Sequence, residues 1–89
     1  MTTVEEVFNQ AAEDLKKIKA NPSQEELLQL YGLCKQATEG DNTTPKPGFF
    51  NLQKKSKWLA WDQVKGMSQE DAREVYIKLV NELKAKYGY

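Results

Sequence analysis

The segment Ser23-Gln24-Glu25-Glu26-Leu27-Leu28-Gln29-Leu30-Tyr31-Gly32-Leu33-Cys34-Lys35-Gln36-Ala37-Thr38-Glu39 decides the fold of this 89-residue chain. A serine followed three residues later by a glutamate is a capping box, which predicts that a helix begins here and runs to about Glu39. Its apolar positions spread around much of the helix: Leu27, Leu28, Leu30, Tyr31, Leu33, Cys34 and Ala37. One partner helix would not cover so wide a surface, so we expect this helix to contact two others.

Another helix is predicted before this segment. Thr3 and Glu6 have the spacing of a second capping box, and Asn21-Pro22 ends the helix because proline disfavours helical geometry in the residue before it. Apolar residues recur at spacings of three and four, the pattern of an amphipathic helix: Val4, Val7, Phe8, Ala11, Ala12, Leu15 and Ile18. Ala11 and Ala12 have small side chains, so a neighbouring helix could pack closely there or a groove could remain.

Two further helices are predicted in the second half of the chain. The third covers about Leu52 to Lys65, and Gly66 can close it in the left-handed conformation. Ser68 caps the fourth, whose single apolar stripe runs to Tyr87. The sequence therefore predicts an all-α domain.

A long connection joins the second and third helices. Gly40 follows the second helix, and residues 41–50 then form an irregular segment that is long for a domain of this size. A connection of this length does not require the two helices that it joins to be antiparallel neighbours. Phe49 and Phe50 either pin the connection to the core or form an exposed apolar lip.

The composition favours binding over catalysis. Eighty-nine residues make one domain, and 13 basic against 13 acidic side chains give no excess positive charge for general nucleic-acid binding. The chain has no histidine, so it lacks the usual general base and the commonest metal ligand. With Cys34 as its single cysteine, it also offers no zinc-binding spacing.

The sequence also predicts a cytoplasmic location. A lone cysteine cannot form an internal disulfide, which favours a reducing compartment. No run of 18 apolar residues occurs, and the first residues lack the basic and apolar regions of a signal peptide.

Positive charge and aromatic rings gather in the middle of the chain. Residues 42–61 contain four lysines, no acid and both tryptophans. On a helix, Lys54, Lys57, Trp58 and Trp61 would fall within an arc of about 100°. This side would suit an anion with an apolar or aromatic part. Alternatively, the tryptophans fill the core and the lysines are solvated.

A similar alignment occurs on the second helix. Leu28, Tyr31 and Lys35 would lie within about 60° of one another. They form either a second cationic and aromatic pair of a binding site or a core aromatic with a lysine whose stem is buried.

The order of these features resembles the acyl-CoA-binding proteins. The matching segments are Leu30 to Thr38, Gly40-Asp41, Lys46-Pro47-Gly48, Lys57 to Trp61, Ser68 to Ala72, Tyr76-Ile77 and Lys86-Tyr87-Gly88. The resemblance implies a four-helix up-down-down-up bundle with a long connection between helices 2 and 3, formed by residues 1–89 as a single domain.

The resemblance also implies a function. The protein would bind one long-chain fatty acyl-CoA and act as an intracellular acyl-CoA carrier and pool former, without catalysis, cofactor or metal. It would be a monomer with transient contacts to membranes or acyl-CoA-using enzymes, and it would not bind nucleic acid. The implied ligand-binding residues are Lys57, Tyr31, Lys35, Tyr76 and Lys16 at the nucleotide end, and Phe8, Ala12, Leu27 and Leu28 on the acyl and pantetheine side.

Lys57 would bind the ribose 3′-phosphate, Trp58 is expected to form a wall of the groove, and Trp61 is expected to lie in the core. The chain departs from the family pattern at Cys34, at Gln53-Lys54 and at Phe49-Phe50. An alternative function is a helical interaction or signalling module that docks a protein partner through the Phe49-Phe50 loop.

Overall fold

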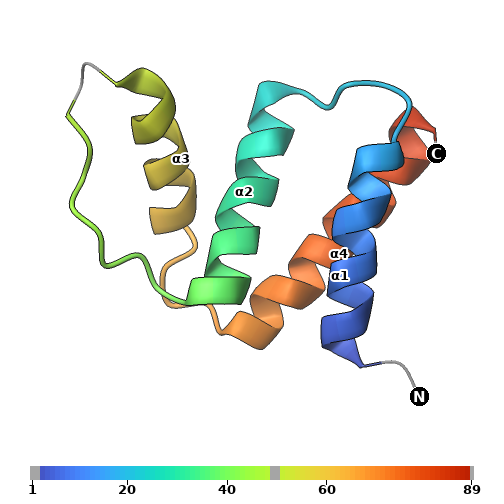
Figure 1. Cartoon of the computed structure of the whole chain (residues 1–89), viewed down its shortest axis with the longest axis horizontal. Helices are drawn as coiled ribbons and strands as arrows, with labels where there is room; N and C mark the ends of the chain where they lie inside the picture. The colour runs from blue at the N-terminus through green and yellow to red at the C-terminus, as the bar shows by residue number, and fades with distance from the viewer. Residues whose placement is uncertain (1–2, 49–50, 89) are drawn as a thin grey trace.

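Four helices make up the regular structure of residues 3–48 and 51–88, the part of the chain that the computed structural model describes. They are α1 (Val4–Lys17), α2 (Gln24–Glu39), α3 (Leu52–Asp62) and α4 (Gln69–Tyr87). In Figure 1, α1 and α4 run upward while α2 and α3 run downward. The predicted all-α fold and its up-down-down-up order are confirmed.

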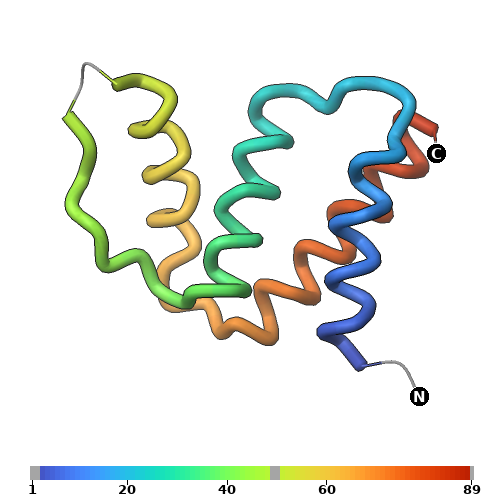
Figure 2. Tube along the Cα trace, in the orientation of Figure 1, coloured from blue at the N-terminus to red at the C-terminus, as the bar shows by residue number. Residues whose placement is uncertain are grey.

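The helices lie in the order α1, α4, α2, α3 across the molecule. Within the described ranges, α4 packs on both α1 and α2, and α3 makes its close helix contacts with α2 alone. The tube in Figure 2 shows α3 at one edge and α1 crossing α4 at the other. The prediction that residues 23–39 contact two other helices is therefore confirmed, with α4 and α3 as the partners.

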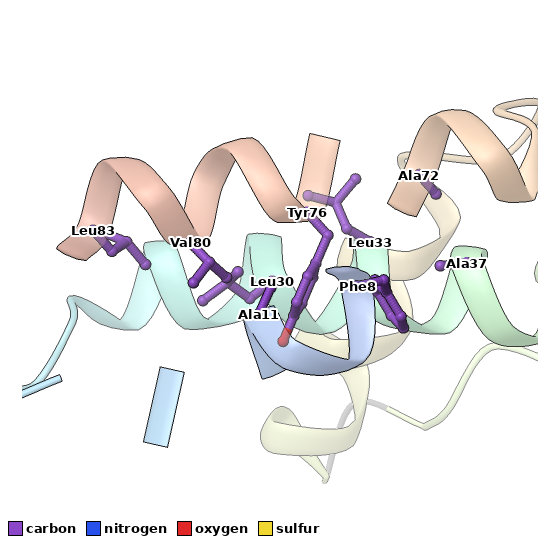
Figure 3. Packing of buried hydrophobic residues seen from close by; sticks show 9 residues of the cluster. All are labelled: Phe8, Ala11, Leu30, Leu33, Ala37, Ala72, Tyr76, Val80 and Leu83. Atoms are coloured by element: carbon purple, nitrogen blue, oxygen red, sulfur yellow. The ribbon is translucent and has the colours of Figure 1, made fainter. Parts of the chain in front are cut away.

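The hydrophobic core lies where α1, α2 and α4 meet (Figure 3). Its buried members are Phe8, Ala11, Leu30, Leu33, Ala37, Ala72, Tyr76, Val80 and Leu83. No residue of α3 belongs to this cluster, although Trp61 of α3 is buried elsewhere. α3 is thus an outer layer attached to a three-helix core.

Side chains cap the helix starts as the sequence predicts. Ser23 and Glu26 form a complete capping box at α2, and Thr3 and Ser68 accept from the third backbone N–H of α1 and α4. Gly40 follows α2 with a φ of 83°, a conformation that glycine adopts without steric cost.

Two predicted helix ends are wrong. α3 stops at Asp62 and not at Lys65, because the N–H groups of Val64 and Lys65 bond to carbonyls three residues earlier, which tightens the chain into turns. α1 stops at Lys17, before Asn21-Pro22. Ile18 is already extended, with φ −63° and ψ 130°, and its side chain packs on the core cluster.

Glu26 links the start of α2 to the end of α4. Its carboxylate accepts hydrogen bonds from the Tyr87 hydroxyl at 2.6 Å and the Ser23 N–H at 2.8 Å, and it pairs with Lys86 at 3.1 Å. These donors, Tyr87 first, lower the pKa of Glu26 from 4.5 to about 2. The native state therefore favours the charged carboxylate more than the unfolded chain does.

This shift predicts a pH dependence of stability. Because the folded pKa is depressed, Glu26 stabilises the protein above pH 4.5, and that contribution disappears as the pH falls towards about 2. In urea titrations across this range, the difference in unfolding free energy between wild type and Glu26→Gln should shrink as the pH falls. The neighbouring Glu25→Gln is the control. A difference that does not change with pH would contradict the prediction.

Candidate functional site

A hollow of about 490 Å³ lies between the N-terminal halves of α2 and α3. We call it the Lys57 pocket; its lining residues are Gln24, Leu27, Leu28, Tyr31, Gln53, Ser56 and Lys57. The Lys57 ammonium lies 5.5 Å from the centroid of the Tyr31 ring, within the range of a cation–π contact. The pocket thus combines an ammonium, a phenol and aliphatic side chains, and it brings together four of the residues predicted for ligand binding.

The charge of Lys57 is available to a ligand. The side chain is exposed, and none of the ion pairs among residues 3–48 and 51–88 includes it. The cation–π contact holds the ammonium near Tyr31 while its hydrogen-bonding capacity stays open. An anion at the pocket mouth would therefore meet a positioned cation that is not neutralised.

Lys35 lies one turn beyond Tyr31 on α2, but its ammonium is already engaged. It forms an ion pair with Glu39, and this hydrogen bond is the main reason that the pKa of Lys35 is raised. The same ammonium lies 5.0 Å from the Trp61 ring centroid. Lys35 is not part of the pocket lining. A phosphate would have to compete with Glu39 for it.

Phe8 and Tyr76 pack against each other inside the core. Their ring centroids are 4.9 Å apart at an interplanar angle of 57°. Figure 3 shows the Tyr76 side chain extending from α4 towards α1. Burial raises the pKa of the Tyr76 hydroxyl to about 12. Ala12 is half-buried beside this cluster. Ligand contacts by these three residues stay a prediction.

Lys16 is exposed on α1, where it pairs with Glu13 at 3.4 Å. It does not line the Lys57 pocket, which is formed by α2 and α3 alone. Its predicted contact with the CoA phosphates therefore stays a prediction.

The two tryptophans hold the connection between α2 and α3. The Trp58 indole N–H donates to the Thr44 carbonyl at 3.0 Å, and the Trp61 indole N–H donates to the Gly40 carbonyl at 2.8 Å. Trp61 is buried, as predicted. Trp58 is half-buried on the side of the connection and not in the Lys57 pocket lining, so its role as a wall of the site stays a prediction.

Asn42 is a supporting residue that the sequence interpretation missed. It is 2% exposed, donates to the Trp58 carbonyl and accepts from the Thr44 N–H at 3.0 Å. The signal was present, because Asn-x-Thr after a helix is typical of a turn in which asparagine bonds to the backbone two residues on. Asn42 therefore positions the helix that carries Lys57.

Gln36 and Asp41 join the end of α2 to the turn between α3 and α4. The Gln36 amide donates to the Asp41 carboxylate at 2.8 Å and to the Met67 carbonyl at 2.7 Å. The Gly66 N–H donates to the same carboxylate, which lowers the pKa of Asp41. Gln36 lies in the predicted second helix, but its position there did not reveal its partner, since Met67 is far along the chain.

Gly32 sets the distance between α2 and α3. A Cβ atom added there would lie 2.3 Å from the carbonyl oxygen of Ala60 and 2.7 Å from its carbonyl carbon. Because both are backbone atoms, the helices approach this closely only if position 32 has no side chain.

Within the described residues there is neither a metal-binding cluster nor a membrane-spanning helix. In residues 3–48 and 51–88, no three His, Cys, Asp or Glu side chains are grouped so as to hold a metal ion. The same residues contain no helix long and apolar enough to cross a membrane. Phe49 and Phe50, on which the alternative docking prediction rests, lie outside the described residues.

A hollow lined by an ammonium, a phenol ring and two leucines suits an anion with an apolar part, so the fold and the site are those of a small ligand-binding domain. Comparison with known proteins then identifies the family. Residues 5–80 match the family model described as acyl CoA binding protein. The chain belongs to the acyl-CoA-binding protein family, so its resemblance to that family is confirmed, as is the expectation of a binding protein and not an enzyme.

Similar proteins cover nearly the whole chain. Acyl-CoA-binding protein homolog 1 of Caenorhabditis elegans is 56% identical over 81 residues, 91% of this chain and 94% of that protein. The acyl-CoA-binding protein of Saccharomyces cerevisiae is 50% identical over 85 residues, 96% and 98% of the two chains. The crystal structure of Oryza sativa acyl-CoA-binding protein 2 superposes with a TM-score of 0.90 at 44% identity, covering 94% of this chain and 93% of that one.

Proposed function

We propose that this protein binds a long-chain fatty acyl-CoA, with the nucleotide phosphates at Lys57 and the first part of the acyl chain along Leu27 and Leu28. The observation that carries the proposal is the exposed Lys57 ammonium, which lies 5.5 Å from the Tyr31 ring centroid in a hollow that Leu27 and Leu28 also line. A CoA thioester presents phosphates at one end and a hydrocarbon chain at the other. The names of the relatives, acyl-CoA-binding proteins, support the same ligand.

The remaining predicted residues would complete the site around this ligand. Lys35 would exchange Glu39 for a phosphate, and Tyr31 would contact the nucleotide. Tyr76, Lys16, Phe8 and Ala12 would line the nucleotide and pantetheine side, and Trp58 would support the groove. No cofactor or metal is needed for this binding.

Hydrocarbon burial would supply most of the affinity. Each buried CH₂ contributes about 0.8 kcal/mol, so a 16-carbon chain has on the order of 10 kcal/mol available. A hydrogen bond from a lysine to a phosphate contributes about 1.5–3 kcal/mol. The chain would therefore set the affinity, while the phosphates fix the head and exclude free fatty acid.

Such a binder acts as a carrier. Residues 1–89 would form a single acyl-CoA-binding domain that works as a monomer in the cytoplasm. It would keep a pool of acyl-CoA and exchange it through transient contacts with membranes or acyl-CoA-using enzymes. The alternative, a module docking through Phe49 and Phe50, is not favoured, because the family to which the chain belongs is one of ligand-binding proteins.

Isothermal titration with palmitoyl-CoA, CoA and palmitate tests the function. We expect tight 1:1 binding of palmitoyl-CoA and much weaker binding of both CoA and palmitate, because only the first ligand fills both the cationic and the aliphatic parts of the site. Equal affinity for the three ligands, or no heat with palmitoyl-CoA, would contradict the proposal.

A further inference from the structure

Glu39 is the last residue of α2, a position at which a carboxylate does not favour the helix. The C-terminal end of a helix carries partial negative charge, and the last turn of α2, from Gln36 to Glu39, contains no basic residue. By contrast, α1 and α4 both have lysines in their last turns. The stability of α2 therefore does not explain why an acid lies at its end.

The carboxylate of Glu39 holds the ammonium of Lys35. Within the described part of the chain, Glu39 is the one acid that forms an ion pair with Lys35. The Lys35 side chain is 30% exposed and that of Glu39 is 52% exposed, so a ligand can reach both. The ammonium also lies 5.0 Å from the Trp61 ring centroid, and the Trp61 indole N–H donates to the carbonyl of Gly40, just after α2. Lys35 is therefore held at the C-terminal end of α2.

This ion pair turns Lys35 away from the Lys57 pocket. The pocket lies between the N-terminal halves of α2 and α3, whereas Glu39 lies at the opposite end of α2 (Figure 1). Tyr31 of the pocket precedes Lys35 by four residues and Glu39 follows it by four, so the two are about 12 Å apart along the helix axis. Because side chains on a helix lean towards its N-terminus, a Lys35 side chain released from Glu39 would lean towards the pocket.

We propose that Glu39 sets the affinity of this protein for the nucleotide phosphates by competing with them for Lys35. The inference rests on the proposed function, because these phosphates belong to the bound acyl-CoA. In the ligand-free protein, Lys35 pairs with Glu39. On binding, the ammonium would leave the carboxylate, turn towards the Lys57 pocket and pair with a phosphate. Glu39 would then have no cationic partner, at a helix end where negative charge is unfavourable.

The competition would weaken binding modestly and assist release. An exposed ion pair between residues four apart on a helix is weak, and lysine before glutamate is the less favourable order, so a phosphate can displace Glu39. Each binding event nevertheless has to break the pair, and the pair forms again when the ligand leaves. Removing the competition should tighten binding by about two- to fivefold. Glu39 would thus keep the ligand exchangeable without touching it.

Titration calorimetry of palmitoyl-CoA on Glu39→Gln tests the proposal. The amide keeps the size of the side chain and removes its charge. We expect the dissociation constant to fall by about two- to fivefold. Glu74→Gln is the matched control, because Glu74 is also exposed and forms no ion pair within the described part of the chain. The control should bind palmitoyl-CoA as wild type does.

A double variant separates competition for Lys35 from a change in the overall field of the protein. In Lys35→Ala there is no ammonium for Glu39 to hold, so adding Glu39→Gln should no longer tighten binding. A gain that persists in Lys35→Ala, or an equal gain in Glu74→Gln, would overturn the inference, as would a Glu39→Gln variant that binds no more tightly than wild type. The proposed function stands in each of these cases. It fails itself if wild type does not bind palmitoyl-CoA.

The NMR signal of the Glu39 side-chain carboxyl carbon provides a second measurement, on the wild-type protein. Adding palmitoyl-CoA should shift this signal, because the carboxylate loses its ion pair with Lys35. The carboxyl signal of Glu74 should stay in place. A Glu39 signal that does not respond to saturating palmitoyl-CoA would show that the pair persists in the complex and would overturn the inference, and this measurement does not depend on a variant that folds.

Discussion

Replacing Gly32 by alanine is expected to destabilise the protein by about 1–3 kcal/mol, the usual range for forcing extra atoms into a packed interface. In an exposed helix interior, the same change would stabilise by roughly 0.5–1 kcal/mol, because alanine has the higher helix propensity. Here the new Cβ would lie 2.3 Å from the Ala60 carbonyl oxygen. Because the Ala60 carbonyl is part of the backbone, it cannot rotate away from the new Cβ as a side chain could, so α3 would have to move away from α2.

Urea unfolding of Gly32→Ala, beside Gly48→Ala, measures this effect. A Cβ at position 48 meets no atom within 4 Å, so the control is expected to be neutral or slightly stabilising. The displaced α3 carries Lys57, so affinity for palmitoyl-CoA should fall as well. A Gly32→Ala variant as stable as wild type would show that α3 is not held at this contact.

Lys57→Ala is expected to weaken palmitoyl-CoA binding by at least about 1.5 kcal/mol, or about tenfold, because a charge-assisted hydrogen bond to phosphate is lost. Folding should hardly change, since Lys57 is exposed and forms no ion pair with the described residues. Lys35→Ala should have a smaller effect on binding, because its ammonium must first leave Glu39.

Titration calorimetry with Lys54→Ala as control separates a specific contact from the general positive field. Lys54 lies on the same helix, is exposed and does not line the Lys57 pocket. If Lys57→Ala and Lys54→Ala lose the same affinity for palmitoyl-CoA, Lys57 acts through long-range electrostatic attraction and not through a direct contact. An equal loss of stability and affinity in Lys57→Ala would instead make Lys57 a structural residue.

Local sequence rules predicted the elements of the fold well. Ser23, Ser68 and Gly40 mark helix ends that are set by residues nearby in the chain. The wide apolar surface of α2 also predicted its two partners. α3 was predicted too long, because the chain after Asp62 tightens into turns, where Asp41, just after α2, accepts from the Gly66 N–H.

Long-range contacts were beyond such rules. Nothing local in the sequence shows that Gly32 meets Ala60 or that Gln36 bonds to Met67, because these pairs form only once the helices are placed. For the site, cation and ring spacing indicated an anion-binding side, and the family resemblance selected Lys57 and Tyr31, which the structure brings together.

The outer position of α3 has a thermodynamic consequence. The core cluster is complete without α3, which is held by α2 and by the segment from Gly40 to Thr44. Segments with few core contacts open separately from global unfolding. A ligand that touches α2 and α3 together binds neither this open form nor the unfolded chain, so it lowers the populations of both. Amide hydrogen exchange would then slow in α3 because local opening is suppressed, and in α4 because global unfolding is suppressed.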